Sequence, residues 1–191
     1  ELPGLGVLAC GPGMTANPDM LPLLEMLLHC GKALLLDADA LNLLCMAPQM
    51  LPQSNAKLIL TPHPGEMRRL ARAFGLNENL PRHEQALALA EKSGAVILLK
   101  GHRSICASPE GRWSCNLSGS AALATAGSGD VLSGVCAAFL GQMPPMQAAA
   151  LGAFLHGLCA ERLKPIGSRG LIADDLLNEI PAAMAQINPK A

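Results

Sequence analysis

A glycine-rich string at residues 126–134, Ala-Gly-Ser-Gly-Asp-Val-Leu-Ser-Gly, has the spacing in this chain that most clearly suggests chemistry. Glycines at 127 and 129 let a ligand approach the backbone, and the following amides open a predicted helix, whose N-terminus attracts anions such as phosphate. A carboxylate beside phosphate is repelled, so we interpret Asp130 as a general base that takes a proton from an attacking hydroxyl. Helix capping by Asp130 is the alternative. The string is not a Walker A motif, because no Lys-Ser/Thr follows the glycines.

Two further polar residues follow apolar runs. Lys100 ends the run at residues 95–99, where a lone ammonium is costly to bury without an anion. It either contacts a phosphate or extends to solvent along its aliphatic stem. His63 lies between two prolines that hold its backbone extended. Its imidazole either contacts a substrate or bonds to the backbone of a turn.

The remaining polar candidates are open to several readings. Asp37 and Asp39 follow another apolar run and could be metal ligands, ribose acceptors or turn residues. Asp39 directly precedes a predicted helix, so we interpret it as the helix cap. Glu66 is interpreted as a carboxylate in the first turn of a helix, and His156 as a core histidine with its hydrogen bonds made. No metal-binding residue is assigned.

Short apolar runs that alternate with helical patterns predict a parallel α/β sheet flanked by helices. The predicted strands are residues 7–9, 33–36, 57–60 and 95–99, and the helices among them are residues 19–30, 40–47, 66–74 and 82–93. A turn-rich link then joins two short runs into a hairpin at the sheet edge, residues 104–107 and 112–116, followed by helices at 129–140, 147–164 and 173–180. Ligands of such sheets bind beyond the carboxyl ends of the strands, which is where the polar residues fall.

Composition narrows the class of protein. The chain has 191 residues, half of them hydrophobic, with 14 Lys+Arg against 15 Asp+Glu, a net charge of −1. We therefore expect one domain, residues 1–191, that binds neither nucleic acid nor a membrane surface, since both need a basic excess. Seven cysteines without a C-x-x-C pair, and no signal or membrane-spanning segment, favour free thiols in a cytoplasmic protein. The chain begins at Glu1 and runs at once into an apolar strand, so we expect the domain to be N-terminally truncated.

Taken together, these strings resemble the ADP/ATP-dependent NAD(P)H-hydrate dehydratases of the ribokinase-like superfamily. The glycine–aspartate string alone indicates only the superfamily, whereas its combination with Thr-Pro-His-Pro-Gly-Glu and Asp-Ala-Asp-Ala-Leu-Asn indicates the dehydratase. The matching strings are residues 11–13, 37–42, 61–66, 100–101, 127–134 and 169–176.

The resemblance implies a ribokinase-like fold and a repair reaction. A hydrated nicotinamide ring, that of NADH or NADPH hydrate, is phosphorylated at the expense of ADP (or ATP, with Mg²⁺), and elimination of phosphate restores the reduced nucleotide. Asp130 is then the catalytic base. The substrate-binding residues implied are Gly13, His63 and Asp130, and the nucleotide-binding residues are Lys100, Gly101, His102, Arg103, Ser104, Gly127, Ser128 and Gly129. The resemblance also implies a homo-oligomer, and an NAD(P)H-hydrate epimerase domain or protein as functional partner.

Three departures from the family pattern stand out. Ser104 replaces a threonine, residues 119–123 replace a Gly-Asn-x-Gly-Met string, and the several dozen residues that precede Gly11 in the family are missing. Two alternatives remain open. One is a ribokinase-like kinase acting on a hydroxymethylpyrimidine, a thiazole alcohol or a sugar; the other is a nucleotide-binding module without catalysis.

Overall fold

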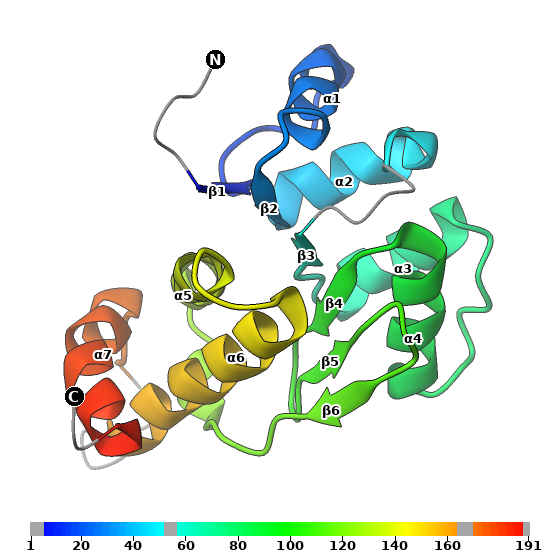
Figure 1. Ribbon diagram of the computed structural model, residues 1–191. Helices are drawn as coiled ribbons and strands as arrows, with labels where there is room; N and C mark the ends of the chain where they lie inside the picture. The colour runs from blue at the N-terminus through cyan, green and yellow to red at the C-terminus, as the bar shows by residue number, and fades with distance from the viewer. Residues whose placement is uncertain (1–5, 52–56, 164–169, 189–191) are drawn as a thin grey trace.

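Four parallel strands form the centre of the fold in this computed structural model, which describes residues 6–51, 57–163 and 170–188. These strands are β1 (Val7–Cys10), β2 (Ala33–Leu36), β3 (Leu58–Leu60) and β4 (Val96–Leu99). The antiparallel hairpin of β5 (Ile105–Ala107) and β6 (Trp113–Cys115) extends the sheet beyond β4. The six strands lie in chain order, β1-β2-β3-β4-β5-β6 (Figure 1). The predicted mostly parallel sheet with a hairpin edge is confirmed.

Helices cover both faces of the sheet because the strands are apolar on both sides. The first face carries four helices, α1 (Leu21–Leu28), α2 (Ala38–Met46), α3 (Pro64–Ala73) and α4 (Arg82–Ser93). The second face carries α5 (Ser128–Leu140) and α6 (Pro145–Arg162), and α7 (Ala173–Ile187) packs outside these two helices. Along β2 the side chains alternate, with Leu34 and Leu36 in the first core and Leu35 in the second. Short 3-10 turns lie at Pro18–Met20, Pro48–Met50 and Ala121–Leu123.

Most helices lie within two residues of their predicted ends, with two informative exceptions. The helix predicted over 19–30 is divided into a 3-10 turn, capped by Asn17, and α1, which ends at Leu28. The last helix was predicted to stop at Ile180, yet α7 continues through Pro181 to Ile187. Leu176 and Ala183 lie two turns apart and are both fully buried, so packing outweighs the cost of the proline. Lys164, the predicted end of the preceding helix, lies outside the described residues.

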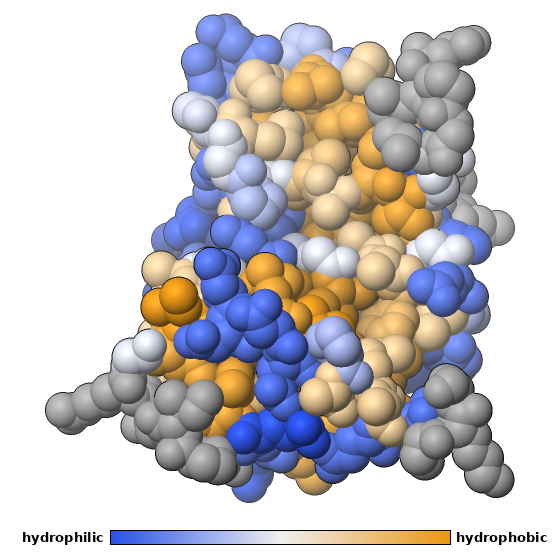
Figure 2. Space-filling view, turned by 90° about the vertical axis from the view of Figure 1, so that its left-hand side faces the viewer, coloured by the Kyte–Doolittle hydropathy of each residue, from blue (hydrophilic) through white to orange (hydrophobic). Residues whose placement is uncertain are grey.

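Apolar side chains also gather on the outer surface over the side of the molecule that carries β1, α5 and α7 (Figure 2). Large apolar side chains that are exposed on the outer helices include Met26 of α1 and Leu177 and Met184 of α7. Among the helices of the described residues, none combines the length and the apolarity that crossing a bilayer requires.

Candidate functional site

A buried ion pair lies where β2 and β4 end. The Lys100 ammonium Nζ is 2.6 Å from Oδ1 of Asp37, and the Ser133 hydroxyl of α5 donates to Oδ2 of the same carboxylate at 2.7 Å. The Asp37 side chain is 2% exposed and that of Lys100 is 18% exposed. A buried carboxylate needs such partners, so this pair ties two strand ends and one helix together. Lys100 therefore does not simply extend to solvent.

Asp37, and not Asp39, is the cap of α2. The Asp37 backbone is extended and its Oδ1 accepts from the Ala38 amide at 2.8 Å, so the helix begins two residues earlier than predicted. Asp39 lies inside the first turn, where its carboxylate accepts from the Thr15 amide at 3.0 Å and from the Asn42 side chain at 3.4 Å. The prediction of Asp39 as the cap is wrong because a capping residue must stand outside the helical turn, and Asp39 stands within it.

The backbone that follows β1 closes over Asp37. Gly11 has φ of +131°, and a Cβ on it would lie 1.7 Å from the Asp37 carbonyl oxygen, so only glycine fits there. Gly13 has φ of +72° with open space around it. The predicted substrate residue Gly13 therefore lies in a turn at the same rim as Asp37, with room beside it.

The loop after β4 is held from one side by Arg82, the first residue of α4. The Arg82 guanidinium donates to four backbone carbonyl oxygens: Leu99 (3.3 Å), Lys100 (3.2 Å), His102 (2.6 Å) and Arg103 (3.3 Å). The Ser104 hydroxyl closes the turn by donating to the Gly101 carbonyl at 3.1 Å. Residues 100–104, hereafter the lysine loop, thus have one well-defined backbone arrangement.

The glycine-rich string places Asp130 in the open. Gly127 is the N-cap residue of α5 in the left-handed conformation, with φ of 81°, and its carbonyl accepts from the Asp130 and Val131 amides. Within the described part of the chain, the exposed Asp130 carboxylate makes no hydrogen bond or ion pair. The capping alternative for Asp130 is therefore not what the structure shows. We refer below to residues 127–130 as the glycine loop.

The two loops lie against each other. A Cβ on Gly129 would lie 3.8 Å from the Lys100 ammonium nitrogen. The Ser128 hydroxyl is turned away and donates to the Leu123 carbonyl at 2.7 Å, which leaves the backbone of the loop as the part that faces Lys100. A helix N-terminus beside an ammonium group is a favourable place for phosphate.

His63 is the cap of α3. Its Nδ1 accepts from the Gly65 amide at 2.9 Å and the Glu66 amide at 3.4 Å. The buried Glu66 carboxylate accepts in turn from the His63 amide at 2.7 Å. Because Nδ1 accepts, the proton of the neutral ring is on Nε2. The structure thus shows the second of the two alternatives for His63, a turn histidine bonded to the backbone, and its side chain stays 49% exposed. Glu66 lies in the first turn, as expected, and its carboxylate also completes this capping box.

His156 is buried on α6 next to the glycine loop. Burial lowers its pKa to about 4, a shift only partly offset by the nearby Ser128 backbone. Its Nε2 is buried and finds no hydrogen-bond partner among the described residues. The expectation of a core histidine with all its hydrogen bonds made is therefore wrong for Nε2.

Sequence reasoning missed Arg82 and Ser133. Ser133 lies one helical turn after Asp130 inside the string already singled out, so helical spacing could have placed it near the site. Arg82 begins a helix, where the dipole disfavours a cation. That unfavourable placement is a sequence signal that its charge serves a contact elsewhere.

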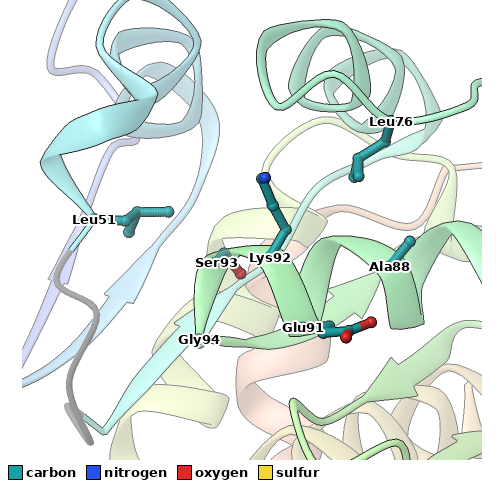
Figure 3. A pocket seen from close by; sticks show the side chains of 7 residues that line it. All are labelled: Leu51, Leu76, Ala88, Glu91, Lys92, Ser93 and Gly94. Carbon is teal, nitrogen blue, oxygen red and sulfur yellow. The ribbon is translucent and has the colours of Figure 1, made fainter.

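The remaining candidate groups are metal-ligating side chains, the thiols and a cavity elsewhere in the molecule. The described residues contain no group of three His, Cys, Asp or Glu able to hold a metal ion. All seven cysteines are free thiols, as expected, and burial raises the pKa of Cys106 to about 12. A cavity of about 650 Å³ lies at the opposite end of β4 (Figure 3), where Lys92 extends into the gap and Glu91 points away. Its lining is Leu51, Leu76, Ala88, Glu91, Lys92, Ser93 and Gly94.

Comparison with known proteins matches residues 2–182 to the family model of the NAD(P)H-hydrate dehydratases. The chain is 41% identical over 190 residues to the bifunctional NAD(P)H-hydrate repair enzyme of Moorella thermoacetica, covering 98% of this chain and 36% of that enzyme. It is 42% identical over 159 residues to the ADP-dependent (S)-NAD(P)H-hydrate dehydratase of Neisseria meningitidis, covering 81% and 53%. It thus spans between a third and a little over half of these relatives.

A solved structure gives the same likeness in three dimensions. The ADP/ATP-dependent NAD(P)H-hydrate dehydratase of Bacillus subtilis, co-crystallised with ATP and Mg²⁺, superimposes with a TM-score of 0.83 at 31% identity. The match covers 96% of this chain and 65% of that one.

Proposed function

The chain belongs to the NAD(P)H-hydrate dehydratase family, and from that premise we propose that it uses ADP to dehydrate the hydrates of NADH and NADPH. The observation that carries this proposal is the juxtaposition of the lysine loop with the glycine loop, beside the Asp130 carboxylate, which bonds to none of the described residues. A nucleotide phosphate fits between an ammonium and a helix N-terminus, and the free carboxylate fits a proton acceptor.

The nucleotide is proposed to bind along the lysine loop, with Lys100, Gly101, His102, Arg103 and Ser104 around it. The backbone of Gly127, Ser128 and Gly129 provides the other wall. Asp37 pairs with the Lys100 ammonium before the nucleotide binds. The ammonium is therefore already ordered, and less conformational entropy is lost when a phosphate binds to it. Fixed donors stabilise charge on a transferring phosphoryl group better than mobile ones.

Asp130 is proposed to act on the hydrate. Its carboxylate takes the proton of the ring hydroxyl, whose oxygen forms a bond to the terminal phosphorus of ADP as the bond to the bridging oxygen breaks and AMP leaves. The phosphate ester then departs by cleavage of the carbon–oxygen bond, and loss of a proton from the ring restores the dihydronicotinamide and releases inorganic phosphate. Gly13 and the exposed edge of His63 are proposed to contact this substrate from the adjoining strand ends.

Mg²⁺ would neutralise part of the phosphate charge when it is bound with the nucleotide. Since no ligand cluster is present among residues 6–51, 57–163 and 170–188, its ligands would be mainly phosphate oxygens and water, which is the coordination that Mg²⁺ prefers at nucleotides. We further propose an epimerase as functional partner, because the Moorella thermoacetica relative is bifunctional. Homo-oligomerisation stays a prediction.

The direct test is to mix the protein with NADH hydrate and ADP, or with ATP, and to follow the absorbance band of reduced nicotinamide. Recovery of the band with release of AMP and phosphate supports the proposal. Failure of recovery, with phosphorylation of a hydroxymethylpyrimidine or thiazole alcohol, would favour the kinase instead. Binding of ADP with neither reaction would favour the inactive module.

A further inference from the structure

The guanidinium of Arg82 binds the backbone carbonyl groups of the lysine loop. We propose that Arg82 is a positioning residue for nucleotide binding. The inference rests on the proposed use of a nucleotide at this loop. It assigns a role to a residue that does not face the ligand but fixes the groups that do.

The first observation is the number of carbonyl groups that one side chain collects. Nη1 of Arg82 donates to the His102 and Arg103 carbonyls, and Nη2 donates to those of Leu99 and Lys100. The planar fork of arginine can span such a set, whereas a lysine ammonium cannot. The contacts join the N-terminus of α4 to a turn 17 to 21 residues further along the chain.

The second observation concerns the amides of the same peptides. A trans peptide directs its N–H away from its C=O, and the described residues contain no cis peptide bond. The carbonyls of Lys100 and His102 point to Arg82, so the amides of Gly101 and Arg103 point to the opposite side of the loop. Neither of these two amides donates to an acceptor within the described ranges. Two free amides that point to the same side of a turn offer donors to an anion there.

The third observation is that this turn is conformationally demanding. Arg103 has φ of 56° and Gly101 has φ of +137°, both in the region that side chains disfavour. A Cβ at Gly101 would lie 3.1 Å from Nη2 of Arg82. The guanidinium therefore packs against Gly101 at a distance that leaves little room for a side chain. Such a backbone persists only where its surroundings hold it. Four hydrogen bonds from Arg82 do so, together with the one from the Ser104 hydroxyl.

The fourth observation is electrostatic. Arg82 pairs with no carboxylate in the described part of the chain, so carbonyl dipoles alone satisfy its charge. A carboxylate partner would compete with these carbonyl groups for the N–H donors of the guanidinium. Its positive charge therefore remains beneath the loop and adds to the attraction for a phosphate on the other side. Arg82 thus contributes both shape and charge without touching the nucleotide.

Titration with ADP separates these contributions. Arg82→Gln should weaken ADP binding, and raise the KM for ADP, about tenfold, because the loop must be ordered by the ligand itself. Arg82→Lys, which keeps the charge, should recover less than half of that loss on a logarithmic scale. The kcat at saturating ADP and the KM for the hydrate should stay within about twofold, since the reacting groups are untouched. Arg72→Gln, which removes an exposed arginine paired with Glu78, is the matched control and should bind ADP normally.

Hydrogen exchange gives a readout that does not need activity. The amides of Lys100 and Asn116 anchor the two ends of the lysine loop, because they donate to the Pro62 carbonyl and the Ser104 carbonyl, each at 2.8 Å. In both Arg82 variants these two amides should exchange faster than in the wild type, while those of β3 and α5 keep their rates. Full recovery of ADP affinity in Arg82→Lys would overturn positioning in favour of charge alone. Unchanged exchange in the loop, or an ADP affinity equal to that of Arg72→Gln, would overturn the role altogether. If the wild type binds no nucleotide, the proposed function fails, whereas faster loop exchange would still uphold the structural role of Arg82.

Discussion

The lysine loop and the glycine loop face the same space but are built in opposite ways. Side chains from other elements fix the lysine loop: Arg82 holds its backbone, and Asp37 holds its ammonium. The glycine loop is formed by the backbone of its own helix and leaves Asp130 exposed. On one side of the site the Lys100 charge is therefore paired and the backbone is held before any ligand arrives. The other side offers a carboxylate that makes no hydrogen bond or ion pair with the described residues.

The contrast follows from burial. Asp37 and Lys100 lie in the interior, where an unpaired charge is unfavourable, so each needs the other. Asp130 lies in solvent, where an unpaired carboxylate costs little. Substitutions on the lysine side should therefore alter stability and binding, whereas those on the glycine side should alter the chemical step.

The largest effect is expected for Asp130→Asn. The amide cannot accept the hydroxyl proton, so turnover of NADH hydrate with ADP should fall by about 10²–10⁴-fold. Recovery of the reduced-nicotinamide absorbance measures it. Glu91→Gln makes an equal charge change near the C-terminal end of α4, away from the two loops, so it is the control and should keep its rate. Turnover like that of the wild type in Asp130→Asn would remove the general base from the mechanism.

Asp37→Asn should be the most destabilising change on the lysine side. It leaves the Lys100 ammonium buried without a counter-charge, so the free energy of unfolding should drop by about 3 kcal/mol in denaturant titration. The double variant Asp37→Asn with Lys100→Met should recover part of that loss, because no buried charge remains. An unchanged unfolding free energy in the single variant would show that the pair is not buried in solution.

The buried His156 beneath the glycine loop should make the stability of the protein depend on pH. Its folded-state pKa, about 4, lies below the ordinary value, so the unfolded chain takes up the proton first as the pH falls. Stability should thus be complete above about pH 6.5 and should decline towards pH 4, by on the order of 1 kcal/mol per pH unit at most. Unfolding measured across this range in His156→Gln should lack that decline, whereas the half-exposed His83→Gln should keep it. Parallel pH profiles for wild type and His156→Gln would contradict the burial of this imidazole.

Ser133→Ala is expected to have the smallest effect. It removes one donor to the Asp37 carboxylate but leaves the Lys100 contact and the Ala38 amide in place. The free energy of unfolding should fall by about 1 kcal/mol, well below the loss in Asp37→Asn. A loss as large as that of Asp37→Asn would mean that the hydroxyl, and not the ammonium, is the main partner of the carboxylate.

Local patterns predicted the sheet, the hairpin and most helices, because short apolar runs and flanking glycines or prolines report directly on strands and helix ends. They could not settle which aspartate caps α2, since Asp37 and Asp39 differ by only two positions and the choice depends on Lys100 and Ser133. Those partners lie 63 and 96 residues away from Asp37. The continuation of α7 through Pro181 could not be predicted from the local sequence either, because it depends on the burial of Leu176 and Ala183 against other helices.

For the candidate site, residue types and strand ends placed Lys100 and the glycine loop at one rim. They did not reveal that Lys100 is already paired, or that Arg82 holds the loop behind it. Both features are contacts between distant segments, and such contacts leave no short-range pattern.

The division of labour between the two loops is tested most directly by calorimetric titration of ADP into Asp130→Asn and Lys100→Met, each checked to be folded. Asp130→Asn should bind ADP within about twofold of the wild type, and Lys100→Met should bind it about tenfold more weakly, since only the latter loses a contact to the phosphate. Equal loss of affinity in both variants, or unaltered affinity in Lys100→Met, would contradict a binding role for the lysine loop that is separate from the catalytic role of Asp130.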